Sequence, residues 1–204
     1  MRSALDHPAA KPALFVLCLV PLVYLLWAAF TNHLGANPAQ ALSRRTGDWT
    51  LRFLCFTLAV TPLRQLTGAA ELVRFRRMLG LYAFFYATLH LLAYAWFDMG
   101  FDWGDIVHDI PKRPFVLAGF AAFVLMIPLA ATSFNRAMKA LGGRRWKALH
   151  RLVYAVAVIA LLHFWWMRAG KHDFAEPMAY IAIVSVLLGW RAWRRARGMR
   201  TATA

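Results

Sequence analysis

Six apolar stretches, each long enough to approach the length of a membrane-spanning helix, constrain this chain more than any other feature. They run approximately over residues 13–31, 51–66, 79–97, 115–132, 149–167 and 178–193. A hydrocarbon core of about 30 Å needs roughly 20 apolar residues in helical form, and a spanning backbone must satisfy its own hydrogen bonds. With 61% hydrophobic residues and short polar linkers, the sequence predicts an all-α integral membrane protein. We expect one transmembrane domain over residues 1–204, a bundle of six helices.

The first apolar stretch also has features of a secretory signal. Lys11 precedes it, and Ala39-Gln40-Ala41 follows it. Its apolar core is longer than the roughly 7–15 residues of a typical signal peptide. We therefore expect it to be retained as a span, and its removal would leave the other five spans in the same orientation.

Basic residues are distributed unevenly between the two sides of the predicted bundle. The N-tail, the 64–77 loop, the 136–151 loop and the C-tail hold 17 of the 24 lysines and arginines. Seven of the nine acidic residues fall on the opposite side. The positive-inside rule therefore predicts that both termini are cytoplasmic. The net charge of +15 is explained by topology and attraction to anionic lipid, or by docking of an acidic partner, rather than by nucleic acid.

Several kinds of site are excluded by missing motifs. Cys18 and Cys55 lie in separate apolar stretches, so neither a disulfide framework nor a cysteine cluster for zinc or iron–sulfur is predicted. A Cys-x-x-Cys-His motif for covalently attached haem is absent. Neither a GxGxxG nor a Walker A pattern occurs. The spans contain no paired carboxylates and no Ser-His-Asp set, so hydrolytic chemistry is not indicated.

Three of the seven histidines, His90, His150 and His163, lie in or at the edge of apolar stretches. An ionisable group inside a membrane is costly and marks a functional candidate, whereas the alternative is a neutral imidazole that bonds a neighbouring helix. At about 1.5 Å of rise per residue, His90 and His163 reach a similar depth on two helices that run in the same direction. Two such imidazoles suit the axial positions of a six-coordinate haem, which transfers electrons and has no open iron site.

A second candidate site combines His150 with two arginines of the third stretch. His150 and His163 lie about 140° apart around a regular helix, so they do not share one face. Arg76 and Arg77 lie level with His150, and guanidinium groups suit propionates, a flavin phosphate or a quinone head. His150 is therefore either a contact to such a cofactor or a ligand to a second haem.

Four segments carry a resemblance to a known family. They are RRMLGLYAFFYATLHLLAY (76–94), KRPFVLAG (112–119), PLAATS (128–133) and WKALHRLVYAVAVIALLHFWW (146–166). Together they resemble the ferric-reductase-like transmembrane domain and, more closely, the MsrQ (YedZ) family of haem-binding membrane subunits. By position, His90, His150 and His163 match the histidines of the family. The chain departs from NADPH-oxidase-like proteins, which have two histidines on the third span.

The resemblance implies cofactors and partners that spacing alone does not indicate. It implies haem b and an FMN site in a bacterial inner membrane. The implied electron donor is the quinone pool or a cytosolic flavin reductase. The implied acceptor is a periplasmic molybdenum-containing methionine-sulfoxide reductase, the catalytic partner in a heterodimer that repairs oxidised proteins. The chain itself would then be the electron-transfer subunit.

Two other functions are compatible with the same sequence. One is a quinone-coupled cytochrome b that serves another periplasmic oxidoreductase. The other, from a different class, is a small membrane transporter or assembly factor without haem, in which the histidines bond helices together or relay protons. The chain shows no clear inverted repeat and no pair of interrupted spans, which are typical of transporters.

Overall fold

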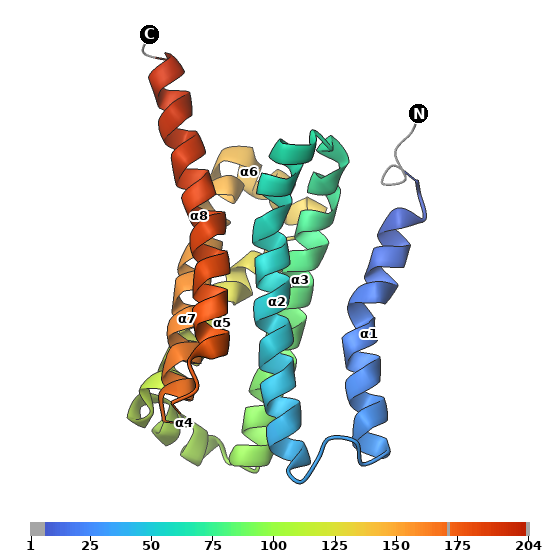
Figure 1. Cartoon of the computed structure of the whole chain (residues 1–204), viewed down its shortest axis with the longest axis vertical. Helices are drawn as coiled ribbons and strands as arrows, with labels where there is room; N and C mark the ends of the chain where they lie inside the picture. Colours follow the sequence, from blue (N-terminus) through green and yellow to red (C-terminus); the bar gives the residue numbers. More distant parts are fainter. Residues whose placement is uncertain (1–6, 171, 203–204) are drawn as a thin grey trace.

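The computed structural model describes residues 7–170 and 172–202, and within them it contains helices and turns but no β-strand. Arg2 and Lys171, two basic residues in the orientation argument, lie outside the described residues. The long helices lie roughly along one direction as a bundle (Figure 1). The helices are α1 (Ala10–Phe30), α2 (Pro38–Thr67), α3 (Val73–Ala93), α4 (Trp103–Lys112), α5 (Pro114–Ala131), α6 (Asn135–Leu149), α7 (Leu152–Ala169) and α8 (Ala175–Ala202).

The shorter helices mark the two ends of the bundle. Helix α4 lies at one end, and α6 lies at the other, where α1 begins and α8 ends (Figure 1). A 3-10 turn, Ala70–Leu72, precedes α3, and a π-helical turn, Tyr94–Asp98, extends it toward α4. Both described ends of the chain are thus on the α6 side of the bundle.

The all-α membrane fold is confirmed, whereas the count of six spans is confirmed only in part. Among the described residues, four helical segments are long and apolar enough to cross a membrane: Ala10–Phe30, Ala70–Asp98, Pro114–Ala131 and Leu152–Ala169. Helices α2 and α8 contain the second and sixth predicted stretches and are 30 and 28 residues long. They are more polar on average, and in α2 the residues Arg52 and Arg64 lie close to the two ends of the apolar centre.

Local sequence signals fix both ends of α2 and the start of α5, two helices that support the sites described below. The Asn37 side chain accepts a hydrogen bond from the Gln40 amide at 3.0 Å, so it caps the first turn of α2. Gly68 ends α2 in the left-handed conformation, with φ of 72°, which glycine adopts without steric cost. Helix α5 begins at Pro114, where the missing amide hydrogen removes no helical bond.

Aromatic packing joins α1, α2 and α3 in the core. The Phe53 ring of α2 stacks on Tyr82 and Tyr86 of α3 with centroid distances of 5.5 and 5.2 Å. Tyr86 is fully buried, and its hydroxyl donates to the Cys18 carbonyl at 3.0 Å and accepts from the Leu22 amide at 3.1 Å. The tyrosine therefore satisfies its own polar group while it attaches α1 to the bundle.

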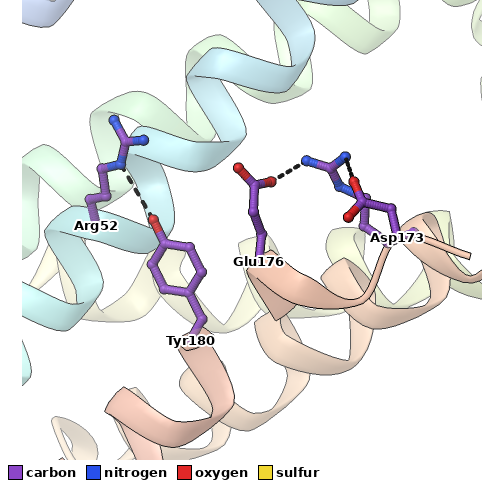
Figure 2. Close-up of polar contacts among 5 residues, drawn as sticks. Arg52, Asp173, Glu176 and Tyr180 are labelled. Atoms are coloured by element: carbon purple, nitrogen blue, oxygen red, sulfur yellow. Dashed lines mark hydrogen bonds and ion pairs between the residues drawn. The ribbon is translucent and has the colours of Figure 1, made fainter. Parts of the chain in front are cut away.

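A polar cluster joins α7 and α2 to α8 at the α4 end (Figure 2). The Arg168 side chain is only 5% exposed and donates to Asp173 at 2.7 Å and to Glu176. One turn further along α8, the Arg52 Nε–H of α2 donates to the Tyr180 hydroxyl at 3.3 Å. Figure 2 shows the two carboxylates turned toward one guanidinium, so the turn before α8 is held against the end of α7.

We expect the double variant Asp173→Asn, Glu176→Gln to have a lower melting temperature in detergent than the parent protein. The Asn and Gln oxygens could still accept from Arg168, but its buried guanidinium would lose both countercharges, and a buried charge without a countercharge is destabilising. Melting is followed by loss of helical circular dichroism. Asp105→Asn, which changes an exposed carboxylate at the same end, is the control and should melt like the parent. Equal melting of all three proteins would contradict a stabilising role for the cluster.

Candidate cofactor sites

Two cavities lie between the helices, one toward each end of the bundle. The α4-side cavity has a volume of about 630 Å³ and includes His90 and His163 in its lining. The α6-side cavity has a volume of about 800 Å³ and includes Arg76, Arg77 and His150. The structure therefore groups the residues singled out in the sequence into two separate sites, with His150 apart from the other two histidines.

His90 of α3 and His163 of α7 face each other across the α4-side cavity. Their ring centroids are 6.0 Å apart, and the ring planes lie at 73° to each other. A metal–imidazole bond is about 2 Å long, so two imidazoles on opposite sides of one metal have ring centres about 6 Å apart. The separation of the two rings fits one iron between them.

Each of these histidines is held by a backbone carbonyl of a neighbouring helix. His90 Nδ1 lies 2.8 Å from the Ser43 carbonyl oxygen of α2, and His163 Nδ1 lies 2.6 Å from the Phe115 carbonyl oxygen of α5. A carbonyl can only accept, so both Nδ1 atoms carry the proton and donate it. This tautomer leaves the lone pair of each Nε2 atom for a metal. In the described residues neither Nε2 has a hydrogen-bond partner.

The rest of the α4-side cavity is mostly apolar, with polar groups near the start of α2. Apolar lining comes from α3, α5 and α7 and suits the faces of a large flat cofactor. Arg44 and Gln40 of α2 also line it. Neither is a candidate on sequence grounds, because both precede the second predicted stretch, which begins at residue 51, whereas α2 begins at Pro38. The apolar lining includes Ala87, Leu91, Phe120, Phe123, Ala160 and Met167.

The α6-side cavity is strongly basic. None of its described lining residues is acidic. Arg191 and Arg195 were assigned to a C-terminal tail, yet α8 continues as a helix and brings both to the cavity. Their spacing of four residues is the sequence signal that they share a helix face. The basic side chains are those of Arg76, Arg77, Arg144, Lys147, Arg151, Arg191 and Arg195.

His150 lies in the turn between α6 and α7 rather than in a transmembrane helix. The fifth predicted stretch began at Leu149, but α7 begins at Leu152. The His150 ring stacks on Trp146 with a centroid distance of 3.9 Å, and its Nε2 atom is 3.1 Å from the Thr132 hydroxyl oxygen. No second histidine lines this cavity in the part of the chain that the structure describes.

Three buried apolar side chains line both cavities and separate them. They come from three different helices, α2, α5 and α7, and none is more than 6% exposed. We call this set the apolar wall. Its members are Leu54, Met126 and Val156.

Comparison with known proteins places the chain in a family. Residues 46–161 match the model of the ferric reductase like transmembrane component. The chain is 64% identical over 92% of its length to a "protein-methionine-sulfoxide reductase heme-binding subunit MsrQ" from Polaromonas naphthalenivorans, covering 85% of that protein. It is 57% identical over 94% of its length to the MsrQ of Ralstonia nicotianae, covering 88% of that protein. No solved structure matches. With matches over nearly its whole length, the chain belongs to the MsrQ family of ferric-reductase-like membrane proteins.

Proposed function

We propose that this protein is a haem b subunit that carries electrons across the bacterial inner membrane to a periplasmic methionine-sulfoxide reductase. The observation that carries the proposal is the pair His90 and His163, with ring centres 6.0 Å apart and both Nδ1 atoms committed to carbonyls. The printed names of the relatives, heme-binding subunits of protein-methionine-sulfoxide reductase, support it. Residues 1–204 would act as one transmembrane domain.

Haem, when bound, supplies a one-electron couple between ferric and ferrous iron. His90 and His163 would hold the haem iron through their Nε2 atoms, because both Nδ1 atoms donate to backbone carbonyls. The carbonyls of Ser43 and Phe115 orient the two rings, and the apolar lining excludes water. The chain would therefore transfer electrons, and the catalytic reduction of methionine sulfoxide would belong to its partner.

The α6-side cavity is the proposed donor end. Seven basic side chains and no acidic one in its described lining suit an anionic cofactor, for which we propose FMN with its phosphate near Arg76 and Arg77. His150 would contact the cofactor because it lines this cavity, and its Nε2 atom lies against the Thr132 hydroxyl rather than against a second histidine. A second haem bound through His150 is the alternative. Electrons would come from the quinone pool or a cytosolic flavin reductase.

The α4 end is the proposed acceptor end, on the periplasmic side. A molybdenum-containing catalytic subunit would bind there as the partner in a heterodimer. The orientation follows from charge, because the α6 end holds most of the basic residues and the described ends of the chain. The positive-inside rule then puts both termini in the cytoplasm.

We expect His90→Ala and His163→Ala each to abolish the low-spin haem spectrum of the purified protein. Loss of one imidazole leaves the iron five-coordinate and attached to the protein by a single bond. Reduced-minus-oxidised absorption spectra and electron paramagnetic resonance measure this change.

His33→Ala and His108→Ala are the controls for these histidine variants. Both histidines are exposed and lie outside the two cavities, so the spectrum should stay intact. A full bis-histidine spectrum in either interior variant would show that the pairing is wrong. A colourless parent protein from haem-replete cells would favour the transporter or assembly-factor function instead.

We expect the double variant Arg76→Gln, Arg77→Gln to slow donor-driven haem reduction by at least about tenfold, which corresponds to about 1.4 kcal/mol. The variant loses two charged contacts to an anionic cofactor. Stopped-flow absorption with a flavin reductase or a quinol as donor measures the rate. Dithionite reduction and the haem spectrum should be unchanged. An unchanged donor-driven rate would exclude the α6-side cavity as the donor site, and loss of a second haem signal in His150→Ala would favour iron over flavin there.

We expect a reporter that works only in the cytoplasm to be active when it is fused after Ala202, and a reporter that works only in the periplasm to be inactive there. Paired fusions of alkaline phosphatase and green fluorescent protein test this orientation, and fusions in the turn between α7 and α8 provide the opposite control. Phosphatase activity at the C-terminal position would contradict both the orientation and the assignment of electron entry to the α6 end.

A further inference from the structure

Two glycines lie where the histidines of the α4-side cavity meet the neighbouring helices. Gly47 of α2 faces the His90 ring, and a Cβ atom added there would lie 3.1 Å from His90 Cε1. Gly119 of α5 faces the His163 ring, and an added Cβ atom would lie 2.8 Å from His163 Nδ1. Side chains essentially never approach a Cβ atom as closely as the second distance. Both rings can therefore keep their present positions only if the neighbouring helix has no Cβ atom at the facing residue.

The same glycines are related to the carbonyls that hold the histidines. Ser43 precedes Gly47 by four residues, and Phe115 precedes Gly119 by four residues. In an α-helix the amide of residue i+4 points at the carbonyl of residue i. Each of these carbonyls thus accepts from a histidine Nδ1–H and from the amide of the glycine four residues later. A methyl group at the glycine would block the approach of the histidine ring.

The arrangement occurs twice, on two independent helix pairs. His90 of α3 meets Ser43 and Gly47 of α2, and His163 of α7 meets Phe115 and Gly119 of α5. Donation from Nδ1–H to an acceptor fixes the tautomer and ring orientation of a metal-bound histidine, and it raises the basicity of the ligand. A more basic ligand stabilises ferric over ferrous iron, so the reduction potential falls.

We propose that Gly47 and Gly119 are positioning residues that give the two axial imidazoles their carbonyl hydrogen bonds and thereby lower the reduction potential of the haem. The proposal rests on the proposed function, because it needs an iron between His90 and His163. The competing explanation is structural, since small residues also let membrane helices pack closely. That explanation predicts a loss of stability without a change in the electronic properties of the iron.

The test compares Gly47→Ala and Gly119→Ala with the parent protein and with Gly189→Ala. Gly189 is a helical glycine of α8 at which an added Cβ atom meets nothing within 4 Å. The purified full chain with bound haem is studied by electron paramagnetic resonance of the ferric state and by optical redox titration. We expect altered g values and a more positive midpoint potential in both interior variants. The shift should be larger for Gly119→Ala, which has the shorter contact, and absent in Gly189→Ala.

Melting of the same variants separates the two explanations. Lower melting temperatures with unchanged g values and potentials would overturn the proposal and leave the glycines a packing role only. If Gly119→Ala does not fold, Gly47→Ala decides, because its contact of 3.1 Å needs only a small displacement of the ring. A parent protein that lacks a bis-histidine signal would contradict the proposed function, whereas a normal parent signal with unshifted alanine variants contradicts this inference alone.

Discussion

Side-chain donors that reach a backbone carbonyl on another helix connect this bundle. Inside a membrane no water satisfies a polar group, so an interior donor must find a protein acceptor. The Tyr86 hydroxyl reaches α1, His90 reaches α2, and His163 reaches α5. Arg191 of α8 likewise reaches the Leu58 carbonyl of α2. Helix packing and the orientation of the two histidines therefore depend on the same kind of contact.

The sequence predicted the helical membrane fold and the proximity of His90 and His163, because both follow from regular helix geometry. The apolar stretches set the long helices, and a fixed rise per residue put His90 and His163 at one depth. The structure brings the two rings within 6.0 Å. The position of His150 was not predictable in this way, because its apolar stretch looks continuous from Leu149, whereas α7 begins only at Leu152. The turn between α6 and α7, which contains His150, has no signal in the hydropathy.

Residues that act through tertiary contacts were not predictable in the same way. Gly47 and Gly119 look like ordinary helical glycines until the histidines of other helices are placed against them. Arg195 lies beyond the predicted sixth stretch, which ends at residue 193, although α8 continues as a helix past that point. Hydropathy alone does not fix the count of spans, because the arginines of α2 lower its mean hydropathy while the helix remains 30 residues long.

The apolar wall has a consequence for what can move through the bundle. The side chains of Leu54 and Val156 have no hydrogen-bond donor or acceptor, and the Met126 thioether is only a weak acceptor, so none of the three can relay a proton. An electron can tunnel through a layer of packed side chains, but a proton needs a chain of polar groups. Charge that passes between the two cavities at this wall would therefore travel without a compensating proton. Under the proposed function, an electron that crosses this wall would carry net charge through part of the membrane, so its transfer would respond to the membrane voltage.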